Sequence, residues 1–375
     1  MALDRIQLAD FRNHRDTHVD GTAQFNLLVG ENGAGKTNVL EAISLLAPGR
    51  GLRRANLADM PAQDGSGGFA VSAALAQDGE AVRLGTGVIA TRPGRRVVQI
   101  NAADTPAVRL AEWLSIGWLT PAMDRLFSES AGARRRFLDR LVLALHPAHA
   151  GHATRMEAAL RERNSLLSQE RAPDPRWLDA IEAQLAVEGA AVSQARASTV
   201  AAIEAVLGQL PEAPFARPTL AYKPGGPLES DALTGALQES RSRDRAAQRT
   251  LIGPHRDEME VVMAAKGQAA ADCSTGEQKA MLIAIVLAHS QLLEDGGGRR
   301  PRLLLLDEVA AHLDPTRRDA LFDRLRAGSA QVWLTGTELA PFSAIRSEAA
   351  DQGRVAPRRN RSSRQGATGG YVPRI

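Results

Sequence analysis

A glycine-rich segment at residues 30–37 constrains this 375-residue chain more than any other feature. It reads G-E-N-G-A-G-K-T, which matches the pattern G-x-x-x-x-G-K-T, and it follows an apolar run at residues 25–29. When a strand precedes such a loop and a helix follows it, backbone N–H groups enclose the phosphates of a nucleotide. The sequence therefore predicts a strand over residues 25–29, a phosphate-binding loop, and a helix over residues 37–47.

The loop also predicts how the phosphates and a metal ion are held. We expect the Lys36 ammonium to reach the β- and γ-phosphate oxygens and the Thr37 hydroxyl to ligate Mg²⁺. The predicted nucleotide-binding residues are Gly30, Glu31, Asn32, Gly33, Ala34, Gly35, Lys36 and Thr37.

Two acidic residues follow a second apolar run much later in the chain. Residues 302–306 read R-L-L-L-L and end at Asp307 and Glu308. A continuous apolar run of this length is typical of a strand buried on both faces. We expect Asp307 to hold Mg²⁺ and Glu308 to polarise the attacking water, which makes Lys36 and Glu308 the predicted catalytic residues.

A third motif lies between these two. Residues 273–279 read C-S-T-G-E-Q-K and precede an apolar stretch, so Ser274 and Gly276 open a helix whose N-terminus favours anions. The motif resembles the S-G-G-Q signature of the ATP-binding-cassette superfamily, although Thr275 and Glu277 depart from it. In that superfamily the signature caps the γ-phosphate held by the opposite subunit, and Asp314 matches its dimer-contact loop. The alternative for Ser274 is an ordinary helix cap.

Helical patterns occupy the middle of the chain. Apolar residues at helical spacing run through residues 177–210, an earlier helix is expected over residues 152–169, and residues 172–175 (A-P-D-P) predict the turn between them. The sequence thus predicts an α/β protein: an ABC-type P-loop ATPase head with a mixed sheet, plus an inserted α-helical arm lobe. The expected lobes are residues 1–118 and 250–345 for the ATPase and 119–249 for the arm, followed by a tail at 346–375.

Several short motifs together resemble the RecF family of bacterial recombination mediators, over about residues 3 to 345. They are L-A-D-F-R-N at 8–13, G-R-G-L-R at 49–53, L-T-P at 119–121, R-R-R-F-L-D at 134–139, G-P-H-R-D at 253–257 and Q-V-W-L-T at 331–335. The last strand ends in Thr335, where transporter cassettes carry a histidine, and this departure favours the RecF family over transporters.

The resemblance implies an ATP-dependent DNA-binding protein. It implies a weak, DNA-stimulated ATPase that forms an ATP-gated homodimeric clamp at gaps between single-stranded and duplex DNA. It further implies RecR and RecO as partners, loading of recombinase, and support of replication and the SOS response. Two other classes remain as alternatives, the ATPase subunit of an ABC transporter and a P-loop small-molecule kinase.

Composition indicates the cellular setting and shows where the positive charge of the chain lies. No run of eighteen apolar residues occurs, the first residues carry no signal-peptide pattern, and the one cysteine permits no internal disulfide, so we expect a cytoplasmic protein without a membrane span. From Asp351 onward the chain is rich in arginine and carries a net charge of +5, whereas the whole chain carries +3. Residues 1–350 therefore carry about −2, and we expect the arginine-rich tail to be disordered.

Overall fold

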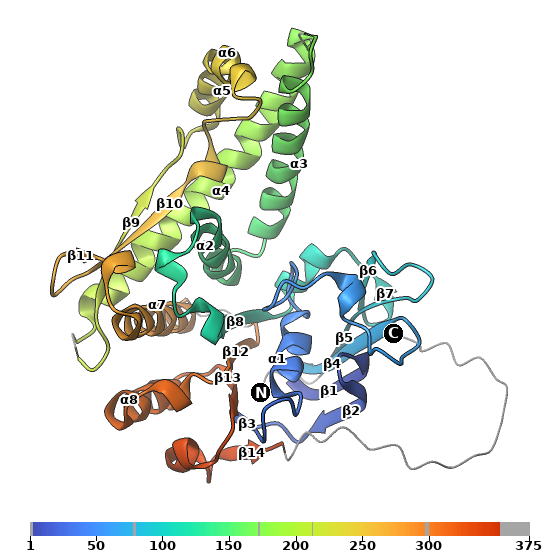
Figure 1. Cartoon of the computed structure of the whole chain (residues 1–375), viewed down its shortest axis with the longest axis vertical. Coiled ribbons are helices and arrows are strands. Elements are labelled where there is room, and N and C mark those ends of the chain that lie inside the picture. Colours follow the sequence, from blue (N-terminus) through green and yellow to red (C-terminus); the bar gives the residue numbers. More distant parts are fainter. Residues whose placement is uncertain (1–2, 78–79, 172, 212, 297–299, 353–375) are drawn as a thin grey trace. The chain divides into compact units, whose positions relative to one another are not determined.

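The computed structural model describes residues 3–77, 80–171, 173–211, 213–296 and 300–352. Contacts divide the chain into two compact units, one formed by residues 1–121 and 298–375 and the other by residues 122–297 (Figure 1). The predicted tail beyond Gln352 and the turn residue Ala172 lie outside the described residues. Within the described part of the chain, no helix has the length and apolar character needed to cross a membrane.

The first unit contains a parallel sheet that carries the two apolar runs named above. Its strands lie in the order β14-β3-β13-β12-β8 and all neighbours are parallel. The helices α1 (Lys36–Ser44) and α8 (Pro315–Ala327) lie on opposite sides of this sheet (Figure 1). The strands are β3 (Phe25–Val29), β8 (Ser115–Leu119), β12 (Arg302–Leu306), β13 (Gln331–Gly336) and β14 (Ala349–Asp351).

An antiparallel sheet completes the first unit. Its order is β2-β1-β4-β5-β6-β7, and its apolar side chains share one core with α1 and with β12 and β13. Alternating apolar residues such as those of β4 place one face of each strand in that core. The strands are β1 (Leu3–Phe11), β2 (His14–Asp20), β4 (Phe69–Gln77), β5 (Glu80–Val88), β6 (Arg96–Ile100) and β7 (Ala103–Asp104).

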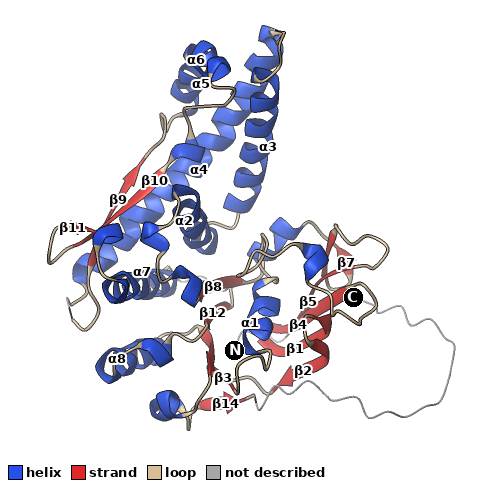
Figure 2. Ribbon diagram, in the orientation of Figure 1, coloured by secondary structure: helices blue, strands red, loops and turns tan. Residues whose placement is uncertain are grey.

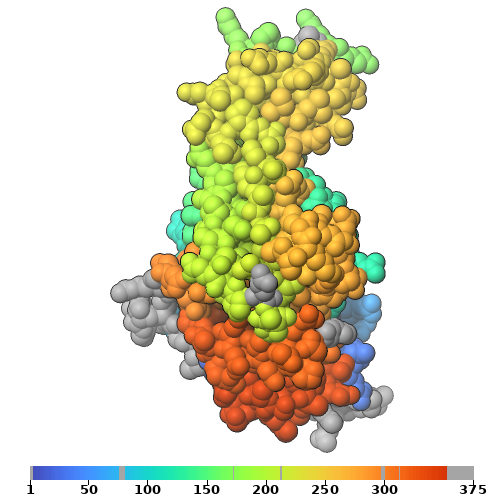
Figure 3. Space-filling view, turned by 90° about the vertical axis from the view of Figure 1, so that its left-hand side faces the viewer, coloured from blue at the N-terminus to red at the C-terminus, as the bar shows by residue number. Residues whose placement is uncertain are grey.

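The second unit is mainly helical (Figure 2). Its longest helix, α4, begins where the Asp174 side chain accepts a hydrogen bond from the Arg176 N–H, with Pro175 at the first helical position. Figure 3 shows the green and yellow surface that its helices form. The helices are α2 (Ala131–Leu145), α3 (His149–Leu167), α4 (Pro175–Gln209), α5 (Ser230–Glu239), α6 (Arg241–Ala246) and α7 (Thr275–Asp295). A small antiparallel sheet has the order β11-β10-β9, formed by β9 (Pro218–Lys223), β10 (Glu258–Met263) and β11 (Gln268–Ala269).

Buried charges join the helices of the second unit. Arg163 of α3 is fully buried and pairs with Glu182 at 2.9 Å and with Asp244 at 2.6 Å. Arg196 of α4 is also buried, and it forms ion pairs with Asp139 and Asp257. Because a buried charge that loses its partner is strongly destabilising, these ion pairs fix the helices to one another.

The division into units differs from the expected lobes by three residues at the first boundary and by far more at the second. The arm was expected to end at residue 249, whereas contacts group residues 250–297 with the helices. The physical reason is pairing and packing within the second unit, because β10 pairs with β9 and α7 packs against α4. Ser274 therefore belongs to the helical unit, while the phosphate loop belongs to the first.

Candidate functional site

The loop at residues 30–37 has the backbone that close approach to phosphate requires. Gly33 and Gly35 have φ values of +82° and +96°, a region that side-chain-bearing residues rarely adopt. A Cβ on Gly35 would lie 2.7 Å from the side chains of Asn13 and His14, whereas one on Gly33 would meet nothing within 4 Å. The positive φ of Gly35 favours glycine, and any larger residue there would also displace the side chains of Asn13 and His14. The space beside Gly33 is open.

Lys36 lies under this loop with its ammonium held by the backbone. Its Nζ donates to the carbonyl oxygens of Gly30 at 2.8 Å and Glu31 at 2.9 Å, and only 5% of the residue is exposed. These two hydrogen bonds hold the positive charge of Lys36 at the inner side of the loop. A phosphate group fits this arrangement, since the ammonium lies against a glycine loop of the kind whose backbone N–H groups bind phosphate.

Three hydroxyl and carboxylate side chains meet where α1 begins and where β12 and β13 end. The Thr37 hydroxyl donates to Asp307 Oδ1 at 2.9 Å, and the Thr335 hydroxyl donates to the same oxygen at 2.7 Å. Asp307 is 6% exposed. Oxygen donors of this kind are the ligands that Mg²⁺ prefers, so Thr37 and Asp307 fit a magnesium ion beside the phosphate loop.

Glu308 follows directly and has an unusual backbone. Its φ is +55°, and its N–H donates to the Thr335 hydroxyl at 2.9 Å. A left-handed conformation costs a non-glycine residue roughly 1–2 kcal/mol, and such strain persists where the surroundings impose it. Thr335 therefore holds both acids of the pair, one through each of its hydrogen bonds.

Two residues between β1 and β2, Asn13 and His14, support the loop from outside, and sequence reasoning gave neither of them a role. The Asn13 amide donates to the Gly33 carbonyl at 3.4 Å and accepts from Asn38 at 2.7 Å. Buried His14 contacts the Gly35 carbonyl through Nε2 at 3.1 Å, and because a carbonyl only accepts, Nε2 carries the proton. Burial lowers the pKa of His14, which keeps the ring neutral. The motif at residues 8–13 drew attention to this turn, but it did not show that the turn contacts the glycine loop.

A buried carboxylate ties the same turn to α1. Glu41 is fully buried and accepts two bonds from the Arg12 guanidinium, at 2.8 and 3.0 Å, and one from Arg53 at 2.9 Å. Both arginines belong to segments that the sequence flagged only as motifs. Their bonds to Glu41 fix α1, and with it Lys36 and Thr37, against β1.

The signature motif forms a reciprocal helix cap in the second unit. The Ser274 hydroxyl accepts from the Glu277 N–H, and the Glu277 carboxylate accepts from the Ser274 N–H and hydroxyl, each at 2.9 Å. Lys266 pairs with the other carboxylate oxygen of Glu277 at 2.5 Å, and this contact lowers the pKa of Glu277 to about 2. Ser274 and Gly276 are exposed. The helix cap that the sequence left as the alternative for Ser274 is thus present.

Asp314 lies apart from the phosphate loop in the chain and begins α8. Its side chain accepts from the Arg317 N–H at 3.0 Å and pairs with the Arg317 guanidinium at 3.5 Å. These contacts make it a helix cap, and the carboxylate stays half exposed. The structure therefore brings Lys36, Thr37, Asp307 and Glu308 together in the first unit, where Asp314 also lies, and places Ser274 and Gly276 in the second.

Comparisons with known proteins agree with these motifs. Residues 2–345 match the family model described as RecF/RecN/SMC N terminal domain. The chain is 44% identical over 373 residues to the "DNA replication and repair protein RecF" of Mesorhizobium japonicum, covering 95% of this chain and 97% of that relative. The protein of the same name from Rhizobium rhizogenes is 44% identical over 356 residues, 92% of this chain and 94% of its own length.

The fold has close counterparts among solved structures. The structure described as "the recombination mediator protein RecF-ATP in RecFOR pathway" matches with a TM-score of 0.80 and 23% identity, covering 90% of this chain and 92% of that one. A second structure, described as RecF-ATPrS in the same pathway, matches with a TM-score of 0.79 over 90% and 93% of the two chains. The expected ABC-type head with a helical arm is confirmed as a fold.

Proposed function

Because this chain belongs to the RecF family within the RecF/RecN/SMC N-terminal domain proteins, we propose that it is an ATP-gated DNA-binding protein of recombinational repair. The observation that carries the proposal is the hydrogen-bonded set Thr37–Asp307–Thr335 beside an open glycine loop. The family supplies the DNA role, since its named relatives are DNA replication and repair proteins. The geometry of these residues supports ATP hydrolysis, which would act as the switch between two states of the protein.

The proposed hydrolysis assigns one task to each side chain. Lys36 exchanges its contacts with the Gly30 and Glu31 carbonyls for the β- and γ-phosphate oxygens and stabilises their charge. Glu308 accepts a proton from water, whose oxygen then attacks the γ-phosphorus while the bond to the β–γ bridging oxygen breaks. Mg²⁺ bound by Thr37 and Asp307 would neutralise charge on the phosphate oxygens. The products are ADP and phosphate.

The proposed gate needs two copies of the chain. ATP held by residues 30–37 of one subunit would contact Ser274 and Gly276 of the other, with Asp314 at the dimer contact. Their exposure in the monomer supports this role, since the signature turn is free to meet a second subunit. Closure would hold DNA at single-strand gaps in the cytoplasm, with RecR and RecO as partners and recombinase loading and SOS induction as outcomes. Hydrolysis would reopen the clamp, and DNA would stimulate it.

Fluorescence anisotropy of a labelled gapped duplex tests the proposal. The parent protein should bind more tightly with a slowly hydrolysed ATP analogue than with ADP, and gapped DNA should raise its ATPase rate. Lys36→Ala deletes the ammonium beside the phosphates and should reduce hydrolysis by about 100-fold or more. Lys36→Arg keeps the charge with the wrong geometry and should recover little.

Two results would contradict the proposal. Equal DNA affinity in all nucleotide states would show that ATP does not control DNA binding. Hydrolysis by Lys36→Ala within about twofold of the parent rate would show that the loop at residues 30–37 takes no part in hydrolysis. A small-molecule kinase or a transporter subunit would bind the ATP analogue yet show no nucleotide-dependent affinity for DNA.

A further inference from the structure

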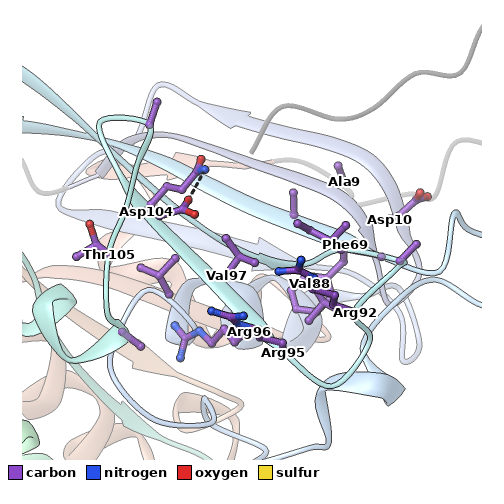
Figure 4. Close-up of a pocket in the computed structure, with 18 of the residues that line it drawn as sticks. Ala9, Asp10, Phe69, Val88, Arg92, Arg95, Arg96, Val97, Asp104 and Thr105 are labelled. Atoms are coloured by element: carbon purple, nitrogen blue, oxygen red, sulfur yellow. Dashed lines mark hydrogen bonds between the residues drawn. The ribbon is translucent and has the colours of Figure 1, made fainter.

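The antiparallel sheet of the first unit carries a pocket of about 1230 Å³ that shares no residue with the nucleotide site. It lies over β5 and β6 and is bounded by the loop that joins them, by the segment that leads into β4, and by residues 102–107 (Figure 4). All of these segments belong to the same unit, so the pocket is formed within one rigid sheet and its loops.

Four arginines line the pocket, and three of them are free to bind something else. Arg83, Arg92 and Arg95 are exposed, and among the described residues their guanidinium groups have no hydrogen-bond or ion-pair partner. Arg96 differs, because its guanidinium donates to carbonyl oxygens at the end of α1 and thereby supports the fold. In Figure 4 Arg92, Arg95 and Arg96 gather at one side of the pocket and Asp104 lies at the other.

The acidic side chains of the pocket are already engaged. Asp10 accepts from the Ser66 hydroxyl at 3.0 Å and pairs with Arg15 at 3.3 Å. Asp104 accepts from the Gln99 amide at 2.9 Å. Asp10 is paired with Arg15, whereas Asp104 keeps its negative charge beside the neutral Gln99 amide. Four arginines against these two carboxylates still leave the pocket with a net positive charge.

This charge is local. Residues 1–350 carry a net charge of about −2, so a cluster of three unpaired arginines does not follow from a generally basic body. Guanidinium groups bind phosphate oxygens through paired N–H bonds, and clusters of them on one face mark nucleic-acid contacts.

We propose that this pocket binds the sugar-phosphate backbone of DNA, with Arg83, Arg92 and Arg95 as its phosphate contacts. The inference rests on the proposed function and adds to it the surface that the DNA touches. The strand β5 carries Arg83, and the β5–β6 connection carries Arg92 and Arg95. Contacts of this kind position the nucleic acid and do not read its sequence.

The apolar part of the lining favours the backbone over the bases. Phe69 is the one aromatic side chain among the lining residues, and it is buried with its ring edge against Phe11 at a centroid distance of 5.2 Å. Base stacking needs an exposed aromatic face, which this ring does not offer.

Salt dependence of DNA binding tests the proposal. Each phosphate contact contributes roughly −0.9 to the slope of log K against log salt for duplex DNA, so replacing all three arginines with Gln should make the slope shallower by about 2 to 3. Affinity for a labelled gapped duplex at about 0.1 M salt should fall by about tenfold or more, and each single variant should shift the slope by about 1. Binding of a fluorescent ATP analogue should stay unchanged, which shows that the variants are folded.

A control separates the pocket from overall charge. Arg161, Arg171 and Arg176 are exposed in the second unit, and replacing these three with Gln removes the same charge elsewhere. An unchanged slope in the pocket variant, or an equal loss in the control, overturns the inference while nucleotide-gated DNA binding by the parent still stands. If the parent binds no DNA in any nucleotide state, the proposed function fails as well. Loss of binding to poly-glutamate with DNA binding intact would assign the pocket to an acidic peptide instead.

Discussion

Thr335 shows how a single hydroxyl can organise both of the consecutive acids, Asp307 and Glu308. It donates to Asp307 and accepts from the Glu308 N–H, and it is almost fully buried at the end of β13. Groups of this kind, which orient a metal ligand without touching the metal, commonly affect metal affinity nearly as much as the ligand itself.

Replacing Thr335 with Val should raise the Mg²⁺ concentration that gives half-maximal hydrolysis by about 10- to 100-fold. Valine keeps the shape of threonine but leaves Asp307 one donor short and the Glu308 N–H without its acceptor. Thr335→Ser keeps the hydroxyl and serves as the control. A magnesium titration of the ATPase rate is the measurement. If the Val variant titrates like the parent, Thr335 does not position Asp307.

At the same scale, the sequence indicated the loop and the two acids but not their supports. Lys36, Thr37, Asp307 and Glu308 fit patterns with fixed spacing, which can be recognised without coordinates. Asn13, His14 and Thr335 act through contacts with residues twenty or more positions away, and such contacts depend on the register of strands. No local pattern encodes that register.

Among the elements, α7 has the most informative beginning. Its cap uses Glu277 where the cassette signature carries glutamine, so a carboxylate lies against the hydroxyl of Ser274. If that hydroxyl serves the γ-phosphate of a second subunit, the negative charge of Glu277 opposes it unless Lys266 offsets it. The pKa of Glu277, lowered to about 2, keeps the carboxylate ionised throughout the neutral range.

Lys266→Ala should therefore weaken ATP-induced dimerisation by roughly fivefold or more, a coupling typical of adjacent charges. Glu277→Gln in the same chain should restore it, because the amide removes the charge and still accepts the Ser274 bonds. Dimer formation against protein concentration at saturating ATP gives both numbers. If the effects of the two substitutions on dimerisation are additive, Lys266 does not act through Glu277, and this account of the cap is wrong.

Elements with strong periodicity were predicted well, and short edge elements were not. The strands β3, β12 and β13 occur where expected. The helix α3 begins at His149, earlier than the expected residue 152. The edge strands β8 and β14 were missed, since five or three residues at a sheet edge carry little pattern of their own.

For the whole molecule, the division of the chain is the feature that sequence patterns described least well. Residues 250–297 follow the arm in sequence and carry the signature motif, yet they pack with the helices through β9–β10 pairing and the contact of α7 with α4. Such packing joins segments tens of residues apart, and motif order alone does not reveal it. The phosphate loop and the signature turn thus belong to separate units of one chain.

The central claim is that ATP, held but not cleaved, joins two copies of this chain. Glu308→Gln keeps the size of the side chain and its hydrogen bonding but accepts no proton, so the variant should bind ATP without hydrolysing it. Sedimentation velocity with Mg²⁺ and saturating ATP should then show a stable dimer, and adding Ser274→Arg should return it to a monomer. A Glu308→Gln protein that hydrolyses ATP like the parent, or stays monomeric under these conditions, would contradict the account.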